Sequence, residues 1–153
     1  MTDTEDKLFP GPFESDQEIR RIGQGLLDHS LPKEEWGHAA HCAAAIYFTL
    51  ERPEIELGRR MPLIIRSYNV ATGVENTQDS GYHETITQLY LKVIRQFLCV
   101  VSNDMALHEI VNFFMCSPFC KLDYLLLFYS RDRLFSKQAR RQFIEPDLRP
   151  FPA

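Results

Sequence analysis

Three histidines in this sequence have a spacing that could bring their side chains together in a binding or catalytic site. His38 and His41 lie three residues apart in a mostly apolar run, 36–48, that is typical of a helix buried in a bundle. Side chains three residues apart leave the same face of a helix, so both imidazoles are expected inside the fold. His83 lies three residues before Ile86, which begins the apolar stripe of a later helix. Since a buried imidazole needs a polar partner, the three histidines are candidates for one shared site.

A divalent transition metal, namely zinc, iron or nickel, is the cofactor that three such imidazoles favour. Three protein ligands with one open position are the pattern of a catalytic zinc site, in which bound water loses its proton near neutral pH. Glu84, next to His83, would take that proton as the general base. An acidic residue in the first turn of a helix also interacts favourably with the helix dipole, so Glu84 has a purely structural alternative.

Four polar residues near these histidines are expected to line a substrate pocket: Tyr68, Asn69, Asn76 and Tyr82. A small-molecule substrate would enter beside the polar loop at 74–80. In the alternative interpretation, the histidines form a buried polar network that bonds to backbone carbonyls and determines how the helices meet.

The sequence therefore leaves two functions open. The first is a metal-dependent enzyme, a hydrolase or lyase, that acts on a small molecule through a histidine-coordinated, metal-bound water. The alternative is a non-catalytic helical domain that binds a ligand or a partner protein and contains a structural histidine network. Replacing His41 or His83 distinguishes these two functions. In the metal-dependent enzyme the replacement would remove the bound metal, and in the non-catalytic domain it would lower the stability of the fold.

The composition is that of an ordinary globular domain, with 153 residues of which 44% are hydrophobic and 25% are charged. The net charge of −4 argues against nucleic acid as a partner, and no apolar run is long enough to span a membrane. The acidic start, 1–7, lacks the apolar segment of a secretory signal, so we expect a cytoplasmic protein with four reduced cysteines. The 11 phenylalanines are many for a thin bundle to bury, and a homodimer would cover those left exposed.

Helical spacing of apolar residues, together with capping residues, predicts an all-α, single-domain helical bundle of about four longer helices plus two or three short ones. The longer helices are expected at about 16–28, 32–51, 53–73 and 81–101, and Pro62 should kink or split the third. Three regions are expected along the chain: a disordered or loosely docked arm at 1–13, the bundle at 14–144, and an extended C-terminal tail at 145–153.

Three motifs in this chain resemble those of a group of small, helical, uncharacterised bacterial proteins. They are Trp-Gly-His-Ala-Ala-His at 36–41, Gly-Tyr-His-Glu-Thr at 81–85 and Glu-Pro-Asp-Leu at 145–148. The resemblance spans about residues 35–150 and implies a bacterial-type helical protein, with no activity attached. A second likeness is to DinB-type bundles, in which three helix-borne histidines hold a divalent metal. It is one of architecture only, because the order of the histidines along the chain differs.

Overall fold

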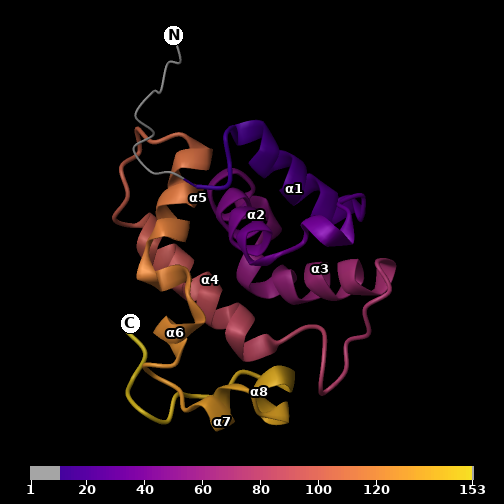
Figure 1. The fold of residues 1–153 in the computed structure, drawn as a ribbon, viewed down its shortest axis with the longest axis vertical. Coiled ribbons are helices and arrows are strands. Elements are labelled where there is room, and N and C mark those ends of the chain that lie inside the picture. Colours follow the sequence, from indigo (N-terminus) through magenta and orange to yellow (C-terminus); the bar gives the residue numbers. More distant parts are fainter. Residues whose placement is uncertain (1–10, 153) are drawn as a thin grey trace.

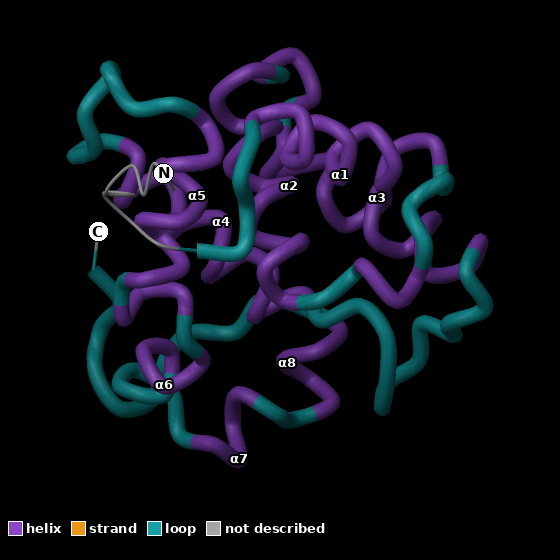
Figure 2. Tube along the Cα trace, turned by 45° about the horizontal axis from the view of Figure 1, so that its top comes forward, coloured by secondary structure: helices purple, strands orange, loops and turns teal. Residues whose placement is uncertain are grey.

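The computed structural model describes residues 11–152, which form helices joined by loops and contain no strand (Figure 2). The longer helices are α1 (Asp16–Asp28), α2 (His38–Glu51), α3 (Leu57–Ala71), α4 (Glu84–Leu98) and α5 (Leu107–Cys116). The shorter elements are α6 (Leu122–Leu125), α7 (Arg131–Leu134) and α8 (Lys137–Arg141), with 3-10 turns at Lys33–Glu35, Pro53–Ile55 and Pro118–Cys120. The predicted all-α, single-domain bundle is confirmed, with α5 joining the four longer helices.

Helix α2 lies at the centre of the bundle, in contact with α1, α3, α4 and α5 (Figure 1). Every residue from Cys42 to Phe48 is buried, because the helix is apolar on nearly all sides. Ala43 and Ala44 have no exposed surface, and such small side chains let neighbouring helices approach closely. The central position of this helix therefore follows from its sequence.

Helix α2 begins later than predicted, at His38 and not near Pro32. Residues Lys33–Glu35 form a separate 3-10 turn, and Gly37 then caps α2 with an extended backbone, φ −100° and ψ −173°. His38 is thus the first residue of the helix, and it is exposed, which corrects the prediction that both imidazoles are buried. His41, one turn further on, is partly buried.

Helix α3 runs through Pro62 as one helix, so the predicted split does not occur. Proline has no N–H, and the carbonyl of Gly58, four residues earlier, therefore lacks its usual helical hydrogen bond. The side chain of Gln88 on α4 donates from Nε2 to this carbonyl at 3.2 Å. The neighbouring helix thus supplies the hydrogen bond that the proline removes.

Helices α7 and α8 lie at the end of the molecule opposite α1, with α8 against the beginning of α4 (Figure 1). The hydroxyl of Thr85 donates to the carbonyl of Gln142 at 2.9 Å and accepts from the N–H of Ile144 at 3.3 Å. Arg140 donates from Nη1 to the carbonyl of Gly81 at 2.9 Å. These contacts hold the start of α4 and the loop before it against the C-terminal part of the chain.

The C-terminal tail is extended and lies on the body of the protein. The backbone N–H of Leu148 donates to the carbonyl of Phe128 at 2.9 Å, and the hydroxyl of Ser130 donates to Asp147 at 2.6 Å. At the other end of the chain, most of the arm predicted at 1–13 lies outside the described residues. Its last residue, Phe13, is buried.

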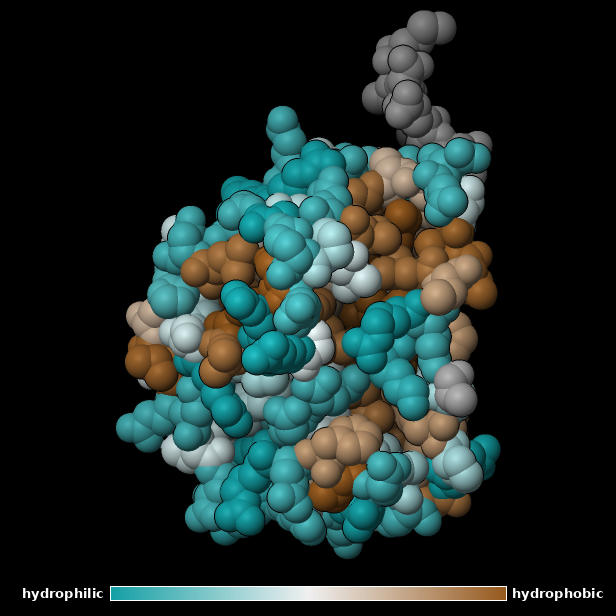
Figure 3. Space-filling view, turned by 180° about the vertical axis from the view of Figure 1, so that it is seen from behind, coloured by the Kyte–Doolittle hydropathy of each residue, from teal (hydrophilic) through white to brown (hydrophobic). Residues whose placement is uncertain are grey.

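The surface carries apolar side chains in several separate patches between hydrophilic ones on the face shown in Figure 3. Three of the exposed large side chains are Phe119, Phe135 and Phe143. In the part of the chain that the structure describes, no helix has the length and apolar character needed to cross a membrane.

Candidate functional site

A cavity of about 450 Å³ opens between α2, α3 and α4, and the loop before α4 forms part of its rim. This volume lies in the usual range of small-molecule sites. The wall is mostly apolar, and its buried apolar members include Ala45, Met61, Ile65, Leu91 and Ile94. No Lys, Arg, Asp or Glu occurs among the described residues that line it. All three candidate histidines line this one cavity, although they come from positions 38, 41 and 83.

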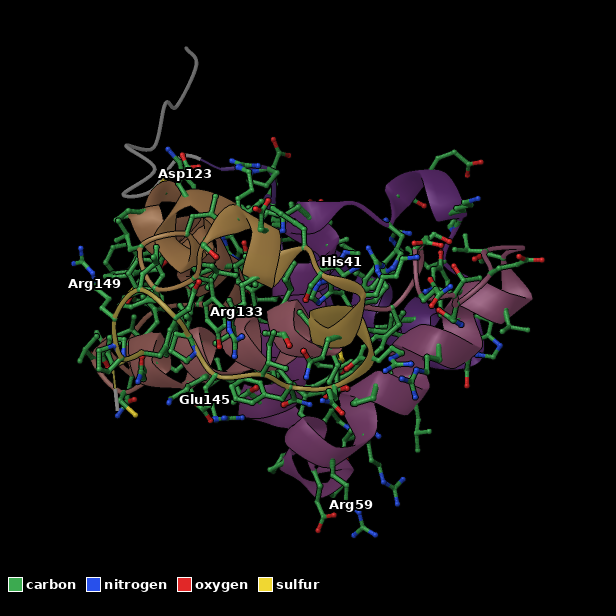
Figure 4. The ribbon with its side chains drawn as sticks, turned by 90° about the horizontal axis from the view of Figure 1, so that it is seen from below. His41, Arg59, Asp123, Arg133, Glu145 and Arg149 are labelled. Carbon is green, nitrogen blue, oxygen red and sulfur yellow. The ribbon has the colours of Figure 1, made fainter. Side chains whose placement is uncertain are left out.

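His41 is the histidine whose ring chemistry is most changed by the fold. Its imidazole stacks on Trp36, with ring centroids 3.6 Å apart, and its Nδ1 donates to the carbonyl of Gly37 at 2.7 Å. Burial lowers the pKa of His41 to about 4, so the ring is neutral at pH 7. In Figure 4, His41 lies toward the middle of the molecule, whereas the charged side chains of Arg59 and Arg149 lie at its periphery.

His38 reaches from the start of α2 to the turn at Pro118–Cys120. Its Nε2 donates to the carbonyl of Cys120 at 2.6 Å, and its ring lies 5.4 Å from the ring of Tyr90. The side chain therefore ties α2 to the segment that follows α5. Sequence reasoning cannot find this partner, because a backbone carbonyl at a distant position has no residue type to mark it.

His83 has hydrogen bonds at both of its ring nitrogens. It is the N-terminal cap of α4, where Nδ1 accepts from the backbone N–H of Ile86 at 3.2 Å. Its Nε2 donates to the carbonyl of Leu134 at 3.0 Å. Burial lowers its pKa, which favours the neutral ring that these two bonds require.

The three histidines share a cavity but do not have the arrangement of a metal site. Among the described residues, no group of three His, Cys, Asp or Glu side chains is placed to hold a metal ion. His83 would have to give up a cap and a bond to α7 before it could bind one. The metal site at His38, His41 and His83 therefore stays a prediction that a metal analysis has to test.

Glu84, the predicted general base, is not among the residues that line the cavity. Its Oε2 accepts from the hydroxyl of Tyr82 at 2.8 Å, and its Oε1 accepts from Gln88 Nε2 at 2.9 Å. Burial and the nearby carboxylate raise the pKa of Tyr82, which keeps the phenol protonated as the donor. In this arrangement Glu84 holds Tyr82 and Gln88 in place.

Two of the four predicted pocket residues, Asn69 and Tyr82, line the cavity, and the other two support it from outside. Tyr68 is fully buried, donates its hydroxyl to the carbonyl of Leu31 at 2.7 Å and contacts the edge of Trp36. The side chain of Asn76 fastens the loop, since its Oδ1 accepts from Asn69 Nδ2 at 2.9 Å and from the N–H of Tyr82 at 3.1 Å.

Residues that sequence reasoning did not assign to a pocket also line the cavity, among them Trp36, Thr87 and Tyr90. Tyr90 lies four residues after Ile86, a spacing that also suits an ordinary core position. Trp36 directly precedes Gly37 and His38 in the sequence. This position next to the candidate histidines was the signal that could have marked Trp36 as a pocket residue. Burial raises the pKa of Tyr90, so its hydroxyl is protonated at neutral pH.

No protein-family model matches this sequence, and no curated protein or solved structure matches it either. The family resemblance of the three motifs therefore stays a prediction. The chemistry of the cavity rests on its residues and their geometry.

Proposed function

We propose that this protein binds a small, uncharged and largely apolar molecule in the cavity between α2, α3 and α4. The observation that carries the proposal is the absence of Lys, Arg, Asp and Glu from the described residues of the wall. A charged ligand would lose its hydration there and gain no counter-charge, which costs several kcal/mol. An apolar ligand would instead bury its surface against side chains such as Met61, Ile65 and Ile94.

In this proposal the histidine network is the frame of the cavity. His38 joins α2 to Cys120, and His83 joins α4 to Leu134. Both bonds end on backbone carbonyls far along the chain, so they hold two walls of the cavity relative to the C-terminal segment. This supports the ligand-binding alternative of the sequence analysis, in which the histidines have structural roles.

A matched set of naphthalene derivatives tests the proposal by isothermal titration calorimetry. Naphthol and its methyl ether are uncharged, whereas naphthoate and naphthylmethylammonium carry opposite charges on the same ring system. We expect the uncharged probes to bind and both charged probes to bind at least tenfold more weakly, which corresponds to about 1.4 kcal/mol or more. Equal or tighter binding of either charged probe would contradict the proposal, as would no binding of the uncharged probes.

Replacing one of two alanines by leucine tests whether the probes bind in the cavity. Ala45 lines the cavity, and Ala45→Leu adds three carbon atoms beside this space, so it should weaken the binding of both uncharged probes. Ala71→Leu makes the same change at an exposed position at the end of α3 and serves as the control. If the two variants bind the probes equally well, the ligand binds elsewhere.

The metal-dependent enzyme is the second candidate function, and one observation favours it. All three histidines line the same cavity, where a small-molecule substrate would also fit. Plasma mass spectrometry on untagged protein tests it, with His41→Ala and His83→Ala as variants. Near one equivalent of zinc, iron or nickel in the parent protein, lost in both variants, would support the enzyme. No bound metal after these ions are added back would exclude this site.

We also propose a cytoplasmic location and a homodimer. The location is supported by the four cysteines, none of which forms a disulfide in the described part of the chain. The dimer is supported by exposed aromatic side chains such as Phe119, Phe135 and Phe143. Sedimentation equilibrium measures the dimer directly, and a mass equal to that of one chain would contradict it.

A further inference from the structure

The hydrogen bonds around His41 determine which of its atoms can still meet a ligand. A carbonyl can only accept a hydrogen bond, so the ring nitrogen that faces the carbonyl of Gly37, Nδ1, carries the proton. In the neutral ring the other nitrogen, Nε2, then has a lone pair and no proton. No described residue bonds to Nε2, and His41 lines the cavity. His41 therefore offers the cavity an acceptor and no donor.

Asn69 presents an acceptor for a related reason. Asn76 Oδ1 accepts from the backbone N–H of Tyr82, and a backbone N–H can only donate, so this atom is an oxygen. The Asn69 atom that bonds to it at 2.9 Å must then be the amide nitrogen. This orientation leaves Asn69 Oδ1 without a hydrogen bond to any residue of the range 11–152, in a side chain that lines the cavity.

We propose that the ligand of this cavity is a neutral hydrogen-bond donor, an apolar molecule with an O–H or N–H group that donates to His41 Nε2. This inference rests on the proposed ligand-binding function and narrows it to a class of ligand. A ligand without a donor would take His41 Nε2 out of water and leave it unpaired, which costs free energy. The oxygen atoms of a carboxylate or phosphate can only accept hydrogen bonds. They would face the lone pair of His41 Nε2 without a hydrogen between them, so the two acceptors would repel each other.

In the methyl ether a methyl group replaces the hydroxyl hydrogen of naphthol, so the ether keeps the oxygen and cannot donate. Because this methyl group is the same in every titration, a change of the naphthol preference between the parent and the His41 variants reports the donor. We expect naphthol to bind the parent protein on the order of tenfold more tightly than the ether. In His41→Phe the aromatic ring that stacks on Trp36 is kept and the acceptor is lost, so the preference for naphthol should disappear. In His41→Gln an amide oxygen is available as acceptor, and part of the preference should remain.

The outcomes separate this inference from the proposed function. Equal affinity of the parent for naphthol and the ether would overturn the inference and leave the neutral-ligand proposal standing. A preference that survives unchanged in His41→Phe would also overturn it, because the donor would then be recognised by another residue. Binding of neither uncharged probe to the parent would overturn the proposed function, and the inference with it.

Discussion

At the scale of single residues, His41 links the cavity to the pH dependence of stability. Burial lowers its pKa in the folded protein to about 4, whereas the unfolded chain keeps the usual value of 6.5. As the pH falls below 6.5, the His41 imidazole becomes protonated in the unfolded chain but stays neutral in the folded protein. The stability associated with the neutral ring is therefore fully present above pH 6.5 and is lost as the pH falls toward 4.

The predicted size of this loss is about 2 kcal/mol in the free energy of unfolding between pH 7 and pH 5. Urea unfolding at the two pH values measures it in the parent and in His41→Gln, whose side chain does not titrate. Other groups titrate in both proteins, so the informative quantity is the difference between the two pH profiles. Identical profiles would show that His41 keeps an ordinary pKa in the folded protein.

His83 provides the second residue-scale prediction. Replacing it with Ala leaves the N–H of Ile86 and the carbonyl of Leu134 without their partner and should cost about 1–3 kcal/mol of stability. His83→Asn is the matched control, because Asn also caps helices well and should recover part of the loss. Thermal or urea unfolding gives both values. A stable His83→Ala variant would argue that the cap and the bond to α7 contribute little.

At the scale of elements, the hydrogen bond between Gln88 and Gly58 predicts a coupling between α3 and α4. Gln88→Ala should cost about 1 kcal/mol in the parent, because the Gly58 carbonyl then loses the donor that replaces the missing N–H of Pro62. In a Pro62→Ala background the backbone supplies that donor, so the same substitution should cost less. A double-mutant cycle measured by urea unfolding tests this, and strictly additive effects would refute the coupling.

The sequence predicts the helical elements well and their starting residues less well. The apolar run at 42–48 was sufficient to place α2 in the centre, because burial on all sides leaves no other position. The predicted start of α2, at residue 32, is wrong because the helix begins at His38, where Gly37 in an extended conformation separates the acidic turn from the helix. Local propensity alone does not distinguish one helix from a 3-10 turn followed by a helix.

The candidate site was predictable in part. Side-chain spacing was sufficient to bring His38, His41 and His83 to one cavity. It was not sufficient to give their partners, because the carbonyls of Cys120 and Leu134 belong to segments placed by the tertiary fold. Glu84 was predicted from its neighbour in sequence, but its hydrogen bonds to Tyr82 and Gln88 hold it away from the cavity.

At the scale of the whole molecule, the C-terminal tail should stabilise the start of α4 from a distance. A chain ending at Ile144 would lose the bonds of Asp147 to Ser130 and of Leu148 to Phe128, which hold the tail on the body. We expect faster hydrogen exchange at 81–98, because α8 would pack against α4 less firmly.

A chain that lacks only residues 149–153 is the control for this truncation, since it keeps both of those bonds. It loses the contacts of Phe151 with Lys92 and of Pro152 with Gln96 on α4, so the difference between the two shortened chains reports the two bonds. Hydrogen exchange followed by mass spectrometry compares the two chains with the parent. Equal protection of 81–98 in all three proteins would show that the tail does not support this helix.

The bonds from His83 to Leu134, from Thr85 to Gln142 and from Arg140 to Gly81 join residues that are 51, 57 and 59 positions apart. During synthesis on the ribosome, α2, α3 and α4 emerge well before the residues that hold the rim of the cavity. A nascent chain that ends in α5 therefore exposes the apolar wall without its frame. The frame of the proposed ligand site is complete only when residues 134–142 have left the ribosome. A prematurely stopped chain would therefore expose an open hydrophobic surface to chaperones and proteases.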